Sequence, residues 1–222
     1  MTDCTEIKIK IEMAHGLFIK KNEKGVDETL LQSLNDLKRR FEKAPWLKVL
    51  DLPKTENQER LIEFAESRRC LLVSIEKCTS LDSVNSENDI YISLSHTTTH
   101  SVAFAVLDNQ QMVKGIGVDL ELKSREIKPE VYDKFTFRSE EGLGLNPLER
   151  WTIKEASFKA GSNETKSEKN TLFQYEIKEF DTNRREGKTA RMQSGIQTPT
   201  HFTSFQLHSL GNLLVTIAID QR

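Results

Sequence analysis

Helix-like and strand-like segments are grouped along this chain and do not alternate with one another. Helical patterns occur at 27–43, 60–75 and 147–160, whereas strand-like runs gather at 90–122 and 172–219. Regular alternation would predict a doubly wound parallel sheet, so the grouping favours an α+β fold. The 222 residues are enough to bury a core, in one large domain or in two small ones.

Capping residues support two of the helices. Asp27 precedes the apolar face of the first helix, and Asn146 with Pro147 opens the third. Asp and Asn side chains accept hydrogen bonds from first-turn N–H groups, and Pro suits the first helical position. We therefore expect helices to begin just after residues 27 and 146.

Strand patterns are clearest in the middle of the chain. IYISL at 90–94, SVAFAV at 101–106 and MVKGIGVDLEL at 112–122 are rich in β-branched and apolar residues. The turn at 108–110 predicts that the last two of these runs form a hairpin. Polar, aperiodic stretches at 79–89 and 181–199 are expected to be loops.

Charge and hydropathy exclude several classes of protein. Lys and Arg number 32 against 34 Asp and Glu, and the net charge of −2 gives no overall attraction to nucleic acid or an anionic membrane. The longest apolar stretch, 213–219, is far shorter than the roughly 20 residues of a membrane span. The three cysteines and the polar start of the chain predict a reducing, cytoplasmic protein.

Two carboxylates stand two residues apart in the third strand-like run. Asp119 and Glu121 would point to the same face of a strand. Such a pair repels itself unless a cation bridges it, and oxygen ligands suit magnesium. Taken alone, the pair is explained at least as well by two solvated acids on an edge strand.

The helix at 147–160 carries a second charged group. Glu155 and Lys159 lie one turn apart, with Trp151 and Phe158 on either side. The simplest interpretation is a surface ion pair worth about 0.3–0.5 kcal/mol, with both aromatic rings in the core.

In combination these blocks resemble the signature of the 4′-phosphopantetheinyl transferases, in the longer, surfactin-synthetase-activating type. The family pattern I-G-V-D-x-E, F-x-x-x-E, W-x-x-K-E-A is matched by Ile116–Glu121, Phe137–Glu141 and Trp151–Ala156. Upstream, Ile92–Thr97 is similar to the family's I-S-x-S-H-S element. The resemblance covers about residues 50 to 160.

The resemblance implies a set of site residues. Asp119, Glu121 and Glu155 would hold Mg²⁺ against the pyrophosphate of coenzyme A, and Glu155 and Lys159 are the catalytic candidates. Lys154 and Lys159 would lie along the phosphates. His96 and Arg68 match positions that contact the 3′-phosphate, although a serine–histidine pair after a strand can also simply hydrogen-bond its own turn.

The resemblance also implies a fold and partners. It predicts two pseudo-symmetric α+β halves, 1–108 and 109–222, the second carrying the magnesium site and the coenzyme lying between them. The reaction would give holo carrier protein and 3′,5′-ADP from coenzyme A and an apo acyl or peptidyl carrier protein. A monomer that binds neither nucleic acid nor membrane is expected. The alternatives are a non-catalytic coenzyme A or carrier-protein binding homologue and a different magnesium enzyme, such as a nuclease.

Overall fold

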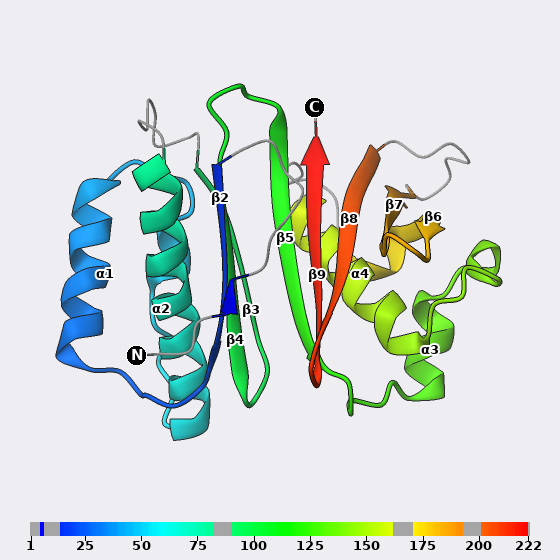
Figure 1. Cartoon of the computed structure of the whole chain (residues 1–222). Helices are drawn as coiled ribbons and strands as arrows, with labels where there is room; N and C mark the ends of the chain where they lie inside the picture. The colour runs from blue at the N-terminus through cyan, green and yellow to red at the C-terminus, as the bar shows by residue number, and fades with distance from the viewer. Residues whose placement is uncertain (1–4, 7–13, 82–89, 162–170, 193–200, 222) are drawn as a thin grey trace. The chain divides into compact units, whose positions relative to one another are not determined.

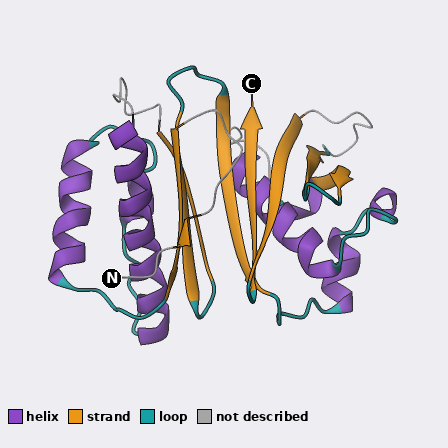
Figure 2. Cartoon of the chain, viewed as in Figure 1, coloured by secondary structure: helices purple, strands orange, loops and turns teal. Residues whose placement is uncertain are grey.

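The chain divides into two compact units, Met1–Gln111 and Met112–Arg222. The computed structural model describes residues 5–6, 14–81, 90–161, 171–192 and 201–221 (Figure 1). The predicted boundary after residue 108 falls in the same connection, between the strands at 100–107 and 113–122. Each unit pairs one antiparallel sheet with at least one long helix (Figure 2), so the α+β prediction is confirmed.

The first unit has a four-stranded antiparallel sheet in the order β1-β2-β4-β3. Helix α2 packs against β2, β4 and β3, and α1 packs on α2. The elements in chain order are β1 (Thr5–Glu6), β2 (Ala14–Lys21), α1 (Glu28–Arg40), the 3₁₀ turn η1 (Leu47–Leu50), α2 (Gln58–Leu81), β3 (Ile90–His96) and β4 (His100–Leu107).

The sequence patterns explain most of this unit. Asp27 caps α1, because its carboxylate accepts a hydrogen bond from Leu30 N at 2.8 Å. Leu30, Leu34 and Leu37 turn inward on the same helical face, as predicted. Helix α2 extends to Leu81, so the loop expected at 79–89 begins later, and its remainder lies outside the described residues.

The second unit has a five-stranded antiparallel sheet in the order β5-β9-β8-β7-β6. Helix α4 packs against β5, β9 and β8. Its elements are β5 (Val113–Leu122), α3 (Pro129–Phe135), η3 (Arg138–Glu140), α4 (Pro147–Gly161), η4 (Leu172–Gln174), β6 (Tyr175–Asp181), β7 (Glu186–Arg191), β8 (His201–Leu210) and β9 (Leu213–Gln221).

Asn146 caps α4 as predicted. Its side-chain oxygen accepts from Glu149 N at 2.9 Å, and the Glu149 carboxylate accepts from Asn146 N at 2.9 Å. This reciprocal pair satisfies two backbone donors at the start of the helix. The first turn of α4 is thereby fixed by the sequence next to it.

Two predictions about the sheets are wrong. The hairpin expected between 101–106 and 112–122 does not form, because β4 pairs with β2 and β3 whereas β5 pairs with β9. The turn at 108–110 leads from the last strand of the first sheet, β4, to the first strand of the second sheet, β5. The polar stretch expected to be a loop at 181–199 contains β7, and residues 193–200 lie outside the described part of the chain. Within that described part, no helix has both the length and the apolar character to cross a membrane.

Candidate functional site

Helix α4 crosses strand β5 at a glycine. A Cβ atom on Gly117 would overlap the backbone of Ala156, so only glycine allows this close approach. Gly117, Asp119 and Glu121 alternate along β5 and therefore share the face on which α4 lies. The crossing thus brings both strand carboxylates toward the part of α4 that carries Glu155 and Lys159.

Each strand carboxylate has a cationic partner. Lys159 Nζ lies 2.9 Å from Asp119 Oδ1 and donates a second hydrogen bond to the Val118 carbonyl at 2.9 Å. The Arg125 guanidinium forms an ion pair with Glu121 and stacks over the Trp151 ring, with Cζ 5.1 Å from its centroid. Lys159 therefore pairs with a strand residue on β5, and its charge also acts on Glu155 by opposing the rise in the pKa of that residue.

The carboxylates of this cluster interact electrostatically. Burial, and then the charge of Asp119, raise the pKa of Glu121 to about 7, against the opposing effect of Arg125 and Lys159. Burial, and then Asp119, also raise the pKa of Glu155, which Lys159 and Arg125 partly oppose. Asp119 and Glu121 are only 5% and 8% exposed, so they are not the solvated edge-strand acids of the simplest interpretation.

The donor chemistry of the cluster suits a hard divalent cation. Asp119 raises the pKa of both Glu121 and Glu155, so added positive charge would stabilise the ionised carboxylates, and oxygen ligands are those that Mg²⁺ takes. Across the described ranges, however, no three His, Cys, Asp or Glu side chains already surround a metal position. Lys159 and Arg125 supply the neutralising charge in this structure.

Lys154 lies elsewhere than the resemblance implied. Its side chain is fully buried, and its ammonium lies 2.6 Å from Glu140 Oε1 and donates to the Phe135 carbonyl. Burial lowers the pKa of Lys154 to about 8, although Glu140 opposes that shift. The ammonium therefore faces the interior of the second unit and is not available to line a phosphate in this structure.

The glutamate that contacts α4 is Glu140, whereas the motif had been matched on its neighbour Glu141. Glu140 is fully buried and accepts hydrogen bonds from Ile177 N at 2.8 Å and Phe137 N at 3.3 Å, while Glu141 is exposed. The F-x-x-x-E spacing from Phe137 selects Glu141 in the sequence, and only the packing shows that Glu140 is the glutamate that reaches α4.

In the first unit, His96 and Arg68 gather around Phe64. The His96 ring meets the Phe64 ring edge-on at 5.2 Å, and Arg68 Cζ lies 5.1 Å from the centroid of Phe64. His96 Nδ1 also lies 3.2 Å from a carboxylate oxygen of Glu63. Arg68 is 8% exposed, donates to Asp51 O at 3.0 Å, and has its pKa lowered by burial. The two residues predicted to bind the same phosphate thus share one aromatic neighbour.

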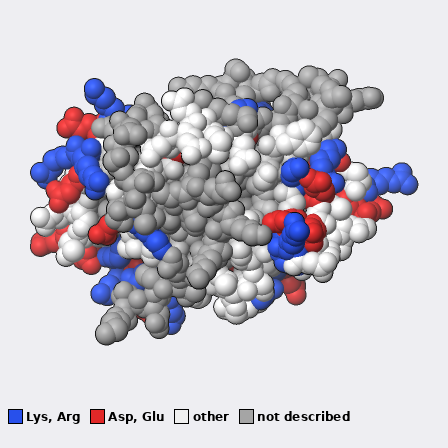
Figure 3. All heavy atoms as spheres, turned by 45° about the horizontal axis from the view of Figure 1, so that its top comes forward, with Lys and Arg blue, Asp and Glu red and all other residues white. Residues whose placement is uncertain are grey.

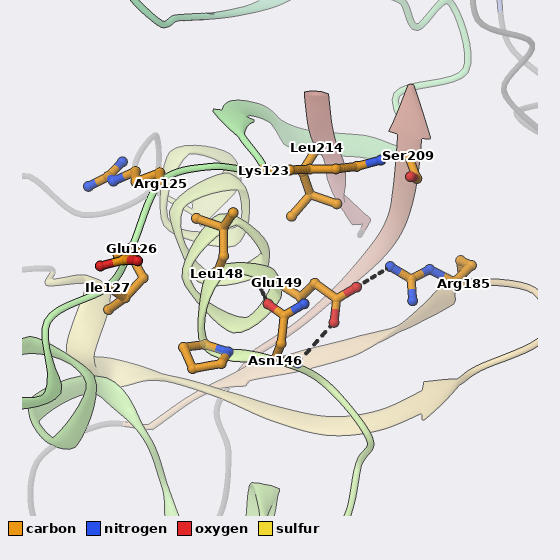
Figure 4. Close-up of a pocket in the computed structure, with 11 residues that line it drawn as sticks. Lys123, Arg125, Glu126, Ile127, Asn146, Leu148, Glu149, Arg185, Ser209 and Leu214 are labelled. Atoms are coloured by element: carbon orange, nitrogen blue, oxygen red, sulfur yellow. Dashed lines mark hydrogen bonds and ion pairs between the residues drawn. The ribbon is translucent and has the colours of Figure 1, made fainter. Parts of the chain in front are cut away.

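None of the predicted site residues lines either of two hollows in the described part of the chain. One of about 490 Å³ lies beside the start of α4 (Figure 4), where Arg185 pairs with Glu149 at 2.5 Å and Lys123 and Arg125 lie along the wall. Another of about 400 Å³ lies in the first unit next to Lys20, Lys24 and Arg69. Arg125 is the residue that the carboxylate cluster and the first hollow share, because it pairs with Glu121 and also lines the hollow.

Sequence reasoning did not find Arg125, Glu63 or Phe64. Arg125 stands four residues after Glu121, but the strand ends at Leu122, so helical spacing gave no signal. Phe64 and Arg68 are spaced four apart on α2, a pattern that could have been noticed. Their meeting with His96 depends on the packing of α2 against β3, which no local pattern shows.

The chain matches no protein-family model, and no curated protein matches it significantly.

Proposed function

We propose that this chain is a magnesium-dependent 4′-phosphopantetheinyl transferase, which moves the 4′-phosphopantetheine group of coenzyme A onto a serine of an apo carrier protein. With this function we also propose the fold of that family, in which the two α+β units are related by pseudo-symmetry. The products are holo carrier protein and 3′,5′-ADP.

The observation that supports this proposal most strongly is the crossing of α4 over β5. It brings Lys159 within 2.9 Å of Asp119, and Glu155 close enough for its pKa to respond to Asp119. These residues come from two separate sequence blocks, and the family resemblance gives both blocks roles in one site. A chance resemblance between short motifs would not require the blocks to meet in space.

The proposed roles follow from charge. Asp119, Glu121 and Glu155 would hold Mg²⁺, which when bound neutralises negative charge on the pyrophosphate of coenzyme A. Lys159 would turn from Asp119 toward a phosphate oxygen, because its side chain is 28% exposed and its amine is a mobile point charge. Glu155, whose pKa is raised, would accept the serine proton directly or through a water.

Little covalent chemistry falls to the protein in phosphoryl transfer, since positioning and charge neutralisation supply most of the rate enhancement. The proposal therefore needs no protein nucleophile. His96 and Arg68, in the first unit, are the candidates for the 3′-phosphate, because both offer donors around the Phe64 ring.

Two alternatives remain. A non-catalytic coenzyme A or carrier-binding homologue would not need Asp119, Glu121 and Glu155 together. A magnesium-dependent nuclease would be expected to carry a basic surface for its substrate. On the face drawn in Figure 3, Lys and Arg side chains lie next to Asp and Glu, in keeping with the net charge of −2.

Release of 3′,5′-ADP from coenzyme A, followed by chromatography, tests the proposal against both alternatives. We expect release only with an apo carrier protein, loss of release with chelator, and recovery with Mg²⁺ or Mn²⁺ but not with Ca²⁺, which prefers longer bonds and more ligands. Full release in excess chelator would contradict the metal assignment. Coenzyme binding without release would favour the non-catalytic homologue.

A further inference from the structure

Among the ion pairs in the described part of the second unit, the one between Lys154 and Glu140 is the most deeply buried. Both side chains are fully buried, and the ammonium and the carboxylate oxygen lie 2.6 Å apart. Lys154 also lies over the Phe137 ring, with Nζ 4.6 Å from its centroid. The pair joins α4 to the segment that precedes it, at a point closed to solvent.

Glu140 connects three parts of the unit. Besides Lys154 on α4, it accepts from Ile177 N on β6 at 2.8 Å and from Phe137 N at 3.3 Å. The guanidinium of Arg150, also on α4, lies 3.6 Å from its second oxygen. The Glu140 carboxylate therefore connects two residues of α4 with strand β6 and with the 135–140 segment.

Stability alone is a weak reason for such a pair. Removing two charges from water carries a large desolvation cost, and apolar residues of similar volume often stabilise a core as well or better. The best-attested benefit of a buried polar contact is that it fixes one arrangement among several. For α4 the quantity to be fixed is the rotation of the helix about its axis.

That rotation determines where Glu155 points. Lys154 and Glu155 are adjacent, and successive residues are separated by about 100° around a helix. Gly117 sets how closely α4 approaches β5, because any side chain there would meet Ala156. A fixed approach and a fixed rotation together hold Glu155 and Lys159 toward Asp119.

We propose that Lys154 and Glu140 are positioning residues that set the rotation of α4 and so align Glu155 and Lys159 with Asp119, and that Lys154 does not touch the substrate. The alignment matters for catalysis only if the proposed transferase function holds. The lowered pKa of Lys154, about 8, agrees with an ammonium held in the interior.

The test uses the whole chain in a Trp46→Phe background, where Trp151 is the one remaining tryptophan. Trp151 lies on α4 and meets the Phe135 ring at 5.3 Å, so a change in rotation alters its surroundings. We expect Lys154→Met to shift the emission maximum of Trp151. The matched control, Lys188→Met, removes an exposed ion pair with Glu179 in the same unit and should leave the emission unchanged.

Kinetics separate positioning from substrate contact. We expect Lys154→Met to lower kcat about tenfold or more, since small misplacements of reacting groups are costly. The Kd for coenzyme A should stay within about threefold, because no binding contact is removed. If Lys154→Met does not fold, the double variant Glu140→Gln, Lys154→Met removes both charges of the pair, keeps a side-chain acceptor for Ile177 N, and should show the same loss of kcat.

The outcomes are distinct. A Kd raised about tenfold or more with unchanged Trp151 emission would make Lys154 a phosphate ligand and overturn the proposal. Unchanged emission together with unchanged kcat would also overturn it. If the wild-type chain transfers nothing but Trp151 still responds to Lys154→Met, the positioning role is supported and the transferase function is what fails.

Discussion

The ammonium of Lys159 on α4 lies 2.9 Å from Oδ1 of Asp119 on β5, and the two residues are forty positions apart in the sequence. This contact joins the strand motif and the helix motif into one charged cluster. The charge of Asp119 also raises the pKa of both Glu121 and Glu155. Four side chains from two motifs therefore act on one another, and the predictions below test that coupling.

Neutral isosteres should remove activity without unfolding the protein. We expect Asp119→Asn and Glu155→Gln each to reduce transfer by about a hundredfold or more, because metal and coenzyme would lose a ligand. Glu155→Gln should not lower the unfolding midpoint, since the raised pKa shows that the fold disfavours its charged form. The control is Glu141→Gln. Glu141 is an exposed residue of the Phe137–Glu141 motif, and its replacement should leave activity within a few fold of the wild-type value. Near-wild-type transfer in either site variant would remove that residue from the site.

The pKa of Glu121 predicts how stability depends on pH in the metal-free protein. Between 4.5 and about 7 the folded state keeps a proton that the unfolded chain releases. The free energy of unfolding should therefore fall as pH rises through that window and level off above it. In Glu121→Gln this part of the decline should disappear. Urea unfolding in chelator at several pH values measures it, and equal slopes in both proteins would show that Glu121 titrates normally.

Replacing Gly117 should weaken the helix–strand crossing. Gly117→Ala forces a Cβ atom into the backbone of Ala156, and we expect a loss of about 1–3 kcal/mol in the free energy of unfolding. Gly25→Ala is the matched control, because its Cβ would meet only Ile62, at 3.9 Å. Equal stability of the two variants would mean that α4 can move away from β5 at little cost.

Much of the fold could be predicted from local patterns. The apolar face after Asp27 and the Asn146–Pro147 start are complete within a few residues, so α1 and α4 followed from the sequence. Strand β7 could not be predicted from its sequence, EGKTAR, because that sequence is polar. Its pairing with β6 and β8 holds it as a strand. The turn at 108–110 suggested a hairpin, since a turn signal does not say which distant strand each side will pair with.

Some residues of the candidate site could likewise be predicted from the sequence, and others could not. Asp119, Glu155 and Lys159 could be selected from motif spacing, and the structure brings Lys159 to Asp119. Arg125 could not be selected from motif spacing, because its contact with Glu121 depends on the chain turning back after β5. Lys154 was assigned to phosphates by its place in a motif, whereas its burial against Glu140 depends on packing in three dimensions.

His96 can be tested with a pair of substrates. If its imidazole donates a charge-assisted hydrogen bond to the 3′-phosphate, His96→Ala should lose on the order of 1.5–3 kcal/mol of coenzyme A binding. Affinity should fall roughly tenfold or more. Binding of 3′-dephospho-coenzyme A should barely change, because the group that His96 would hold is missing. Equal weakening of both ligands would mean that His96 supports its contacts with Glu63 and Phe64, and Arg68 would be the next residue to test.

The most direct measurement is the mass of a carrier protein after incubation with this chain, coenzyme A and Mg²⁺. The account predicts that an apo acyl or peptidyl carrier protein gains the mass of one 4′-phosphopantetheine group. A carrier whose acceptor serine is replaced by alanine should gain nothing, and Glu155→Gln should leave the apo carrier unmodified. An unchanged carrier mass with wild-type protein, across both acyl and peptidyl carriers and with coenzyme A shown to bind, would contradict the transferase function.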